Sequence, residues 1–178
     1  MAPAANASLL SVIPQTPSAN VGGTLSVDVI ASGLLDGGAP SIGTYDLSLA
    51  YDSSLLSLAG VTFGSGLDVR GFGSLQDWSA SAPGLANVFE LSFDSIDDLT
   101  QLQPDRFRLF TLTFQADAIG ATALTLLINA LGDAAGNALT PDIANASATV
   151  TAVPLPAAVW LLLAGLTTAG FVRRARRQ

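Results

Sequence analysis

The sequence predicts an all-β domain, a two-sheet sandwich of the jelly-roll type, followed by one C-terminal transmembrane α-helix. Between residues 8 and 152, short stretches of alternating apolar and polar residues are separated by Gly, Pro, Asn and Asp, which is typical of strands joined by turns. Eight or nine such stretches follow one another at roughly regular spacing, which indicates two packed sheets. Residues 155–172 then form an uncharged run of eighteen residues, long enough for one membrane crossing.

The first half of the domain contains four expected strands, at residues 8–13, 24–29, 44–51 and 58–63. Pro14 ends the first strand, because proline has no backbone N–H to donate to a sheet. The second strand alternates without a break and turns its apolar residues to the core, namely Leu25, Val27 and Val29. The third strand does the same with Tyr45, Leu47, Leu49 and Tyr51. Asp52 follows and is placed to cap a single helical turn.

The second half contains the other strands, expected at residues 88–94, 107–116, 122–131 and 146–152. In the first of these, we expect Phe89, Leu91 and Phe93 to face the core and Glu90 to face water. The second is apolar on both faces and should lie centrally in its sheet. The Gly- and Ser-rich residues 64–84 are expected to form an irregular surface loop with at most one short strand, and residues 95–105 a polar connection.

The charge and the missing residue types exclude several classes of function. Residues 1–152 hold three of the seven basic residues and all fourteen acidic ones, so their formal charge is −11. Nucleic acids and anionic surfaces would repel such a domain, and no nucleic-acid partner is expected. The chain has no His and no Cys, which excludes zinc sites of the usual kind, Ser-His-Asp and Cys-His catalysis, and thiol redox chemistry. We therefore expect a protein that is not an enzyme.

Two groups of acidic and amide residues are candidate calcium ligands, because calcium binds six to eight oxygen atoms. One group consists of Asp94, Asp97 and Asp98, and the other of Asp133, Asn137 and Asp142 around a predicted tight turn. Neither has the spacing of a defined calcium loop such as the EF-hand. Solvated turn residues are the simpler interpretation, so no cofactor is expected and calcium is the alternative.

Some side chains have the chemistry to bind or cleave a saccharide. Trp78 and Phe72 lie in the Gly- and Ser-rich stretch, where their flat rings could stack on a sugar. A glycosidase would need two carboxylates about 5 to 10 Å apart in a cleft. The available acids are Asp46, Asp52, Asp68, Asp77 and Glu90. The sequence does not place any two of them at that separation, so a glycosidase is the least favoured alternative.

The C-terminal tail, residues 153–178, has the charge pattern of a membrane anchor. Its apolar run would cover about 27 Å as a helix at about 1.5 Å per residue, close to the thickness of the bilayer core. Four arginines follow within five positions, Arg173, Arg174, Arg176 and Arg177. Arginines next to a membrane helix stay on the cytoplasmic side. This orientation places residues 1–152 outside the cytoplasm.

The same tail resembles a known sorting signal. The proline motif Val153-Pro154-Leu155-Pro156, the apolar run and the terminal arginines stand in the order found in the PEP-CTERM protein-sorting signal of Gram-negative bacteria. Leu155 occupies the position where that family usually has Glu. The resemblance implies a sorting tag that is recognised and cut near the proline motif by exosortase, a membrane protease-transpeptidase.

A second resemblance concerns the domain itself. Residues 21–29, residues 45–58, and residues 110–116 followed by Gly120 resemble the strands and turns of the cohesin domain. This resemblance implies a nine-stranded jelly roll, shared with related carbohydrate-binding modules, and binding of dockerin domains through one sheet face. No individual contact residue is transferred from the family.

Three segments are therefore expected: a residual leader at residues 1–7, a cohesin-like sandwich at residues 8–152, and the sorting tail at residues 153–178. An exported domain needs a signal peptide, and residues 1–7 have neither its basic region nor its apolar stretch. We expect the signal peptide to be absent from this chain and residues 1–7 to derive from the region around its cleavage site.

The function expected from these features is that of an exported, non-catalytic protein of the bacterial envelope or extracellular matrix. Its role would be structural or adhesive, in a matrix of exopolysaccharide, with exosortase as a partner and residues 155–172 in the membrane. The domain would face the periplasm from the inner membrane, or lie at the cell surface after the tail is processed. A carbohydrate- or dockerin-binding recognition module is the alternative.

Overall fold

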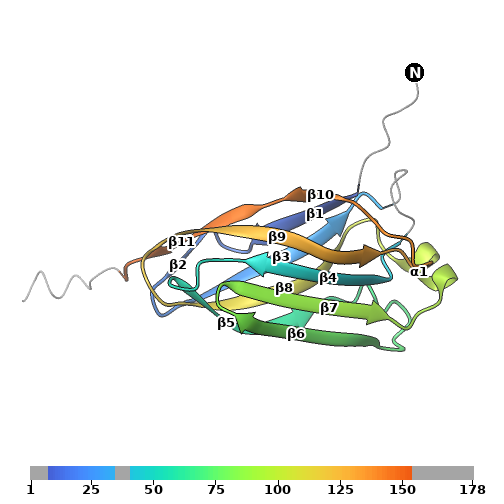
Figure 1. Cartoon of the computed structure of the whole chain (residues 1–178), viewed down its shortest axis with the longest axis horizontal. Helices are drawn as coiled ribbons and strands as arrows, with labels where there is room; N and C mark the ends of the chain where they lie inside the picture. The colour runs from blue at the N-terminus through green and yellow to red at the C-terminus, as the bar shows by residue number, and fades with distance from the viewer. Residues whose placement is uncertain (1–7, 35–40, 154–178) are drawn as a thin grey trace, which may run out of the picture.

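The computed structural model describes residues 8–34 and 41–153, which form a sandwich of two β-sheets (Figure 1). The predicted leader at residues 1–7 lies outside the described residues, and so does the predicted tail beyond Val153, with its membrane helix and arginine cluster. Within residues 8–34 and 41–153, no helix is long and apolar enough to cross a membrane.

Five strands form one sheet and six form the other. In spatial order, the five-stranded sheet consists of β10 (Asp142–Ala144), β1 (Leu9–Pro14), β3 (Thr24–Ser32), β8 (Phe107–Ala116) and β5 (Leu56–Phe63). The six-stranded sheet consists of β2 (Ser18–Asn20), β11 (Ala146–Thr151), β9 (Gly120–Gly132), β4 (Thr44–Ala50), β7 (Leu85–Ser92) and β6 (Ser74–Ala82). Neighbouring strands are antiparallel, except that β10 runs parallel to β1, and β2 parallel to β11.

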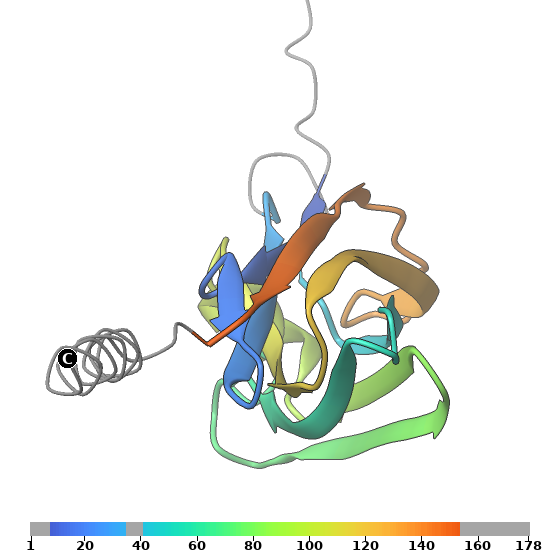
Figure 2. The same ribbon diagram turned by 90° about the vertical axis from the view of Figure 1, so that its left-hand side faces the viewer.

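The core lies between the two sheets, which Figure 2 shows roughly along the strands. The predicted inward row of β3 is confirmed, because Leu25, Val27 and Val29 are all fully buried. Strand β8 lies between β3 and β5, so its predicted central position is confirmed, although its outer face carries threonines and a glutamine and is polar. Two aromatic pairs join the sheets: the rings of Tyr45 and Phe110 are 5.7 Å apart and those of Tyr51 and Phe114 are 4.8 Å apart.

The prediction for the β7 side chains was wrong by one residue. Leu91 and Phe93 are exposed, whereas Val88 and Glu90 are fully buried. Because successive side chains of a strand point to opposite faces, one wrong assignment inverts the whole strand. Glu90 can face the core because the buried Tyr45 hydroxyl and the Ser74 hydroxyl and Gln76 amide of the edge strand β6 donate hydrogen bonds to its carboxylate.

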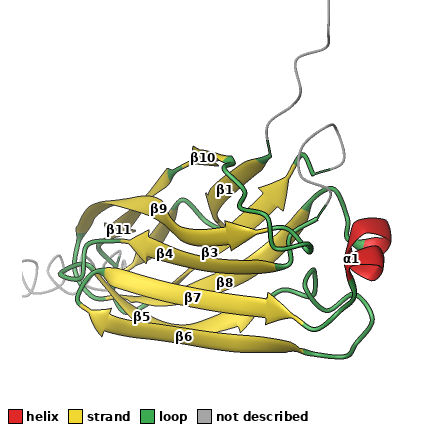
Figure 3. Cartoon of the chain, turned by 45° about the vertical axis from the view of Figure 1, so that its right-hand side comes forward, coloured by secondary structure: helices red, strands yellow, loops and turns green. Residues whose placement is uncertain are grey.

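Two other elements differ from the expectations. The stretch predicted as an irregular loop at residues 64–84 ends in the nine-residue strand β6, and the polar connection at residues 95–105 contains helix α1 (Ile96–Leu102), which covers one end of the sandwich (Figure 3). Ser95 caps this helix, because its hydroxyl accepts a hydrogen bond from the backbone N–H of Asp98 at 3.1 Å. The cap predicted at Asp52 is confirmed, since its carboxylate accepts from the backbone N–H of Ser54 at 2.8 Å.

Candidate functional site

The outer faces of the two sheets differ in chemistry. Directly paired residues share a face, so the pairs of β3 and β5 with β8 define the outer face of the five-stranded sheet. This face is polar and rich in hydroxyl groups, with the residues Thr24, Ser26, Asp28, Ser57, Thr62, Thr111, Thr113 and Gln115. The corresponding face of the six-stranded sheet carries exposed leucines around a polar centre, which makes it the better candidate for binding.

We call this surface the recognition face and define it as the outer face of β9, β4, β7 and β6. Its residues are Asp46 and Ser48 on β4, Asn87, Phe89 and Leu91 on β7, Leu75 and Asp77 on β6, and Leu127 and Asn129 on β9. Leu75, Leu91 and Leu127 are 51%, 39% and 46% exposed. Scattered exposed leucines are normal, but three on the same sheet face offer apolar area to a partner.

Side chains from three strands form the polar centre of the recognition face. The Asn87 amide donates to Asp46 Oδ1 at 2.6 Å and to Ser48 Oγ at 3.2 Å. From the other side, the Asn129 amide donates to the same two atoms at 3.0 and 2.9 Å. The carboxylate and the hydroxyl are therefore held in place before any partner arrives. Within the described part of the chain, no hydrogen bond reaches Asp46 Oδ2, which leaves an oriented acceptor on the surface.

The recognition face is also acidic. Its only charged side chains are Asp46 and Asp77, because the three arginines of the domain lie elsewhere. An acceptor-rich, negatively charged centre flanked by leucines favours a partner that presents donor groups beside apolar side chains.

A buried polar cluster supports the recognition face from below. Glu90 Oε2 accepts a hydrogen bond from the Tyr45 hydroxyl at 2.8 Å, while Oε1 accepts from Ser74 Oγ at 2.6 Å and Gln76 Nε2 at 2.9 Å. Burial raises the pKa of Tyr45, and the charge of Glu90 raises it further, so the phenol stays protonated and donates. The cluster joins β4, β7 and β6, and it thereby fixes the register of the strands that carry the recognition face.

The predicted sugar-stacking residues do not lie on the recognition face. Trp78 pairs with the buried Val88, so it points to the inner side of β6, where the open edge of the sandwich leaves it 42% exposed. Phe72 is 70% exposed and lies in the loop before β6. Within the described residues no aromatic ring contact joins the two, so they do not form a continuous stacking platform.

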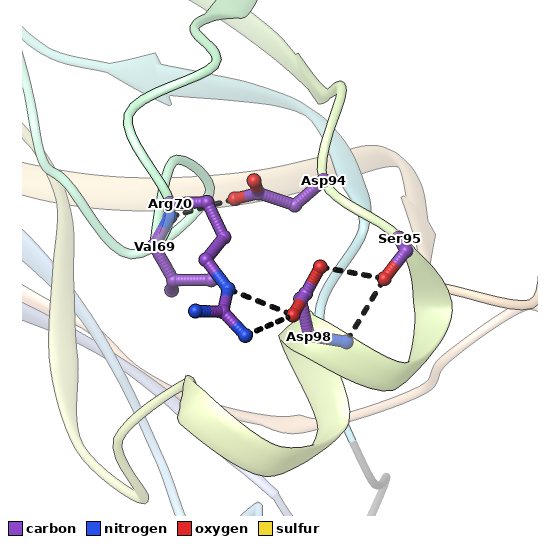
Figure 4. A network of polar contacts seen from close by, with 5 residues as sticks. All are labelled: Val69, Arg70, Asp94, Ser95 and Asp98. Atoms are coloured by element: carbon purple, nitrogen blue, oxygen red, sulfur yellow. Dashed lines mark hydrogen bonds and ion pairs between the residues drawn. The ribbon is translucent and has the colours of Figure 1, made fainter.

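The first group of candidate calcium ligands lies at the start of α1, with Asp97 and Asp98 in its first turn, and Figure 4 shows Asp94 and Asp98. Asp94 Oδ2 accepts from the backbone N–H of Val69 at 2.7 Å, while its Oδ1 is buried without a partner. Asp98 binds the Arg70 guanidinium at 2.7 Å and the Ser95 hydroxyl at 2.7 Å. The hydrogen bond from Ser95, and then that from Arg70, lowers the pKa of Asp98. Both contacts with residues 69 and 70 tie the loop before β6 to the helix.

The second group of candidate ligands is divided between two places. Asp133 closes the turn after β9, where Oδ1 accepts from the backbone N–H groups of Ala135 and Asn137 and Oδ2 accepts from the Asn137 amide. Asp142 lies in β10, on the other sheet. Among the described residues, no three acidic side chains come together as a metal site would require. Calcium binding stays a prediction that this geometry does not support.

The candidate catalytic acids are also dispersed. Glu90 is buried between the sheets, Asp52 lines a shallow hollow beside β9, and Asp68 lines a hollow of about 340 Å³ below α1. Asp46 and Asp77 share the open recognition face, with Phe89 on the strand between them. None of the three described hollows contains two of these five carboxylates, so the arrangement does not provide the paired acids of a glycosidase.

Sequence reasoning missed the polar centre of the recognition face. The signal was present, because Asp46 and Ser48 occupy the outward positions of a strand whose inward row was assigned correctly. Asn87 and Asn129 were not identified. The inverted assignment of β7 placed Asn87 on the wrong face, and a shift of register between β4 and β9 at Asn129 breaks the simple alternation there.

Taken together, the fold and the site define a class of structure: an all-β sandwich of two sheets, one of which carries exposed leucines around a fixed polar centre on its outer face. No protein-family model matches the sequence. No curated protein matches it at a significant level. The similarity lies in the fold, and it is to cohesin domains.

Three solved structures illustrate this similarity. A non-cellulosomal cohesin from the hyperthermophilic archaeon Archaeoglobus fulgidus is 20% identical over 82% of this chain and 92% of its own, with a TM-score of 0.62. The seventh ScaB type I cohesin from Pseudobacteroides cellulosolvens is 18% identical over 85% of this chain and 97% of its own, with a TM-score of 0.65. The sixth cohesin of scaffoldin B from Acetivibrio cellulolyticus is 18% identical over 82% and 100%, with a TM-score of 0.65. The chain therefore has a cohesin-like fold, as the resemblance of its residues to the cohesin domain implied.

Proposed function

We propose that this chain is a non-catalytic recognition module that binds a partner protein of the dockerin class through the recognition face. The observation that carries the proposal is the fixed polar centre of Asp46, Ser48, Asn87 and Asn129, flanked by the exposed leucines. Fixed polar groups supply specificity, and the apolar area around them supplies binding energy.

The chemistry of the face restricts the partner. Asp46 Oδ2 is an acceptor on the surface, whereas Ser48 is only 4% exposed and its hydroxyl, which accepts from two amides, holds the polar centre together. A partner that places a hydroxyl or cationic group against Asp46 and apolar side chains against Leu91 and Leu127 would satisfy both parts of the face. Because the backbone groups within the sheet are already paired, the partner would dock side chains on this face and not add a strand there.

The solved relatives support this proposal. They include cohesins crystallised in complexes with dockerins, from Acetivibrio cellulolyticus and from Clostridium thermocellum. The low identity limits that support to the fold, so the residues on the face of this chain carry the rest of the argument.

Titration of the chain with purified dockerin modules encoded in the same genome, followed by biolayer interferometry, tests the proposal. We expect one of them to bind, and Leu91→Asp and Leu127→Asp each to weaken binding by roughly tenfold or more, as loss of a central apolar contact does. Thr62→Asp is the matched control, because it adds the same charge to the outer face of the other sheet. Absence of binding by every module, or equal loss in the control, would show that the proposal is wrong.

The tail adds a proposal about location. Its proline motif, apolar run and terminal arginines support export and sorting through exosortase, with residues 155–172 in the inner membrane and the domain in the periplasm, or at the cell surface after processing. A structural or adhesive role in an exopolysaccharide matrix is the second candidate function, and the tail is the feature that favours it.

Mass spectrometry of the protein from its native envelope tests the tail. An intact mass that includes Arg173–Gln178 would identify a permanent anchor, and a terminus near Val153–Pro156 would identify a removable tag. Recovery of the protein from the cytosol alone would contradict both forms of the proposal.

A further inference from the structure

Strand β6 has one free edge. It is the last strand of the six-stranded sheet and pairs with β7 alone. Such an edge presents backbone N–H and C=O groups that can pair with another strand. The other three edge strands are less suited to pairing with another strand. Strands β2 and β10 have only three residues each, and the pairing of β5 with β8 shifts between Leu58 and Gly60.

The hydrogen-bonding phase of the sheet tells which residues of β6 point outward. The Tyr51 N–H donates to the Gly84 carbonyl at 2.9 Å, so residues 86, 88 and 90 of β7 bond to β4. The intervening residues of β7 therefore bond to their partners on β6, which are Leu75, Asp77 and Ser79. Gln76 and Trp78 direct their backbone groups away from the sheet.

The side chain of Asp77 binds one of the backbone groups that point away from the sheet. Its Oδ1 accepts the hydrogen bond of the Trp78 N–H at 2.9 Å. An approaching strand would have to displace this carboxylate before it could bond to Trp78. Asp77 is also the only charged residue among residues 74–82, which contain no proline and no arginine.

We infer that Asp77 prevents the free edge of β6 from pairing with the same edge of a second copy of this chain. The edge is complementary to itself, because a two-fold axis brings two identical antiparallel strands together. Residues 74–79 of β6 pair with β7 without a shift of register. Within this stretch, two registers pair five residues of β6 with the same strand of the second copy and place the free backbone groups of the two strands opposite each other. In one, Asp77 lies opposite Asp77 of the second copy, and in the other it lies opposite Leu75 of the second copy.

Both registers are unfavourable while the carboxylate is present. In the first, two negative charges lie directly opposite each other on one sheet face. In the second, a carboxylate loses water against a leucine. In either register two N–H groups, one from each copy, exchange their Asp77 acceptor for a backbone carbonyl, so the gain in hydrogen bonds is small. Removal of the side chain reverses each of these effects.

Sedimentation velocity of the full-length chain, in a mild detergent that keeps residues 155–172 solvated, tests the inference. The wild type is expected to be monomeric. Asp77→Ala removes both the charge and the acceptor and should lower the dimer dissociation constant by at least roughly tenfold. Asp77→Asn removes the charge but keeps an acceptor, so its effect should lie between the two. Asp97→Asn, which removes an exposed charge from α1, is the matched control and should remain monomeric.

A second substitution identifies the edge. Trp78→Pro, added to Asp77→Ala, removes an outward N–H that the pairing with β7 does not use, so it should restore the monomer without breaking the sheet. Hydrogen exchange of Asp77→Ala alone gives an independent measurement, because the Trp78 amide should become protected as the protein concentration rises. A monomeric Asp77→Ala variant, a dimeric wild type, or a dimer without protection at Trp78 would overturn the inference.

Discussion

The substitution Tyr45→Phe tests how the buried cluster below the recognition face contributes to stability. It removes one atom, the hydroxyl that donates to Glu90 at 2.8 Å, and keeps the ring that packs on Phe110. Glu90 would retain its two hydrogen bonds from Ser74 and Gln76 but would lose the third donor to a fully buried carboxylate. The change therefore removes a hydrogen bond to a buried charge, together with the longer hydrogen bond from the same hydroxyl to the Leu109 carbonyl at 3.3 Å.

A hydrogen bond to a charged group contributes about 1.5–3 kcal/mol, and we expect Tyr45→Phe to lower the free energy of unfolding by that amount. Glu90→Gln should cost less, about 1 kcal/mol, because the phenol can turn to donate to the Leu109 carbonyl, which already lies 3.3 Å away. In the double variant the two effects should not add, with a coupling energy of about 0.5–3 kcal/mol, since the residues are in contact.

Urea denaturation followed by circular dichroism measures these differences. A second readout is the pH dependence of stability. Because the pKa of Tyr45 is raised in the folded state, its stabilising contribution is complete below the ordinary tyrosine pKa of about 10 and is lost as the pH rises above it. The wild type should therefore lose stability in alkali more steeply than Tyr45→Phe. If Tyr45→Phe were as stable as the wild type, or if the double variant were strictly additive, the reasoning about the cluster would be refuted.

Three further substitutions have defined outcomes. Gly84→Ala should destabilise the domain by about 1–3 kcal/mol, because Gly84 has a φ of +75° and an added Cβ would lie 2.6 Å from the Tyr51 carbonyl oxygen. Gly60→Ala should cost less, because an added Cβ there has no atom within 4 Å, and thermal melts compare the two variants. Ser95→Ala should cost about 1 kcal/mol in urea denaturation, through loss of the α1 cap, and an unchanged midpoint would contradict this role. Burial alone would raise the pKa of Asp133, but hydrogen bonds from Asn137, Ala135 and Gly136 outweigh it and lower the pKa. The contribution of Asp133 to stability is therefore present above the ordinary pKa of about 3.9 and is lost as the pH falls through the lower folded value. Acid titration of Asp133→Asn should show a shallower loss of stability than that of the wild type.

The fold was predictable because most strands carry a regular alternation. In β3, polar and apolar residues alternate from Thr24 to Val29, and the structure buries the apolar ones. Alternation alone was insufficient in β7, where the row with Phe89 and Leu91 is the more apolar one, yet the row with Glu90 faces the core. The choice of which row of β7 faces the core depends on hydrogen-bond donors from other strands, and the positions of these donors are known only once the sheet has formed.

Helix α1 and the recognition face show two other limits. Ser95 and Asp98 have the spacing of a helix cap, which is a local sequence signal for the start of α1. The polar centre is different, because Asp46, Asn87 and Asn129 are far apart in the sequence and meet only through strand pairing. Single-sequence patterns report which face a residue occupies, but they do not report which residues lie beside it.

The position of β11 affects how the domain would respond to a mechanical load. This strand is the last before Val153, and it is hydrogen-bonded along both edges, to β9 from Ala146 to Val150 and to β2 from Thr149 to Thr151. If the protein is held through its C-terminal end while a partner on the recognition face pulls in the direction of the strands, the force acts along β11 and shears both ladders together. Hydrogen bonds loaded in parallel must break at the same time, whereas bonds at a peeled edge break one after another. The domain is thus built to transmit tension through its last strand without unravelling from that end.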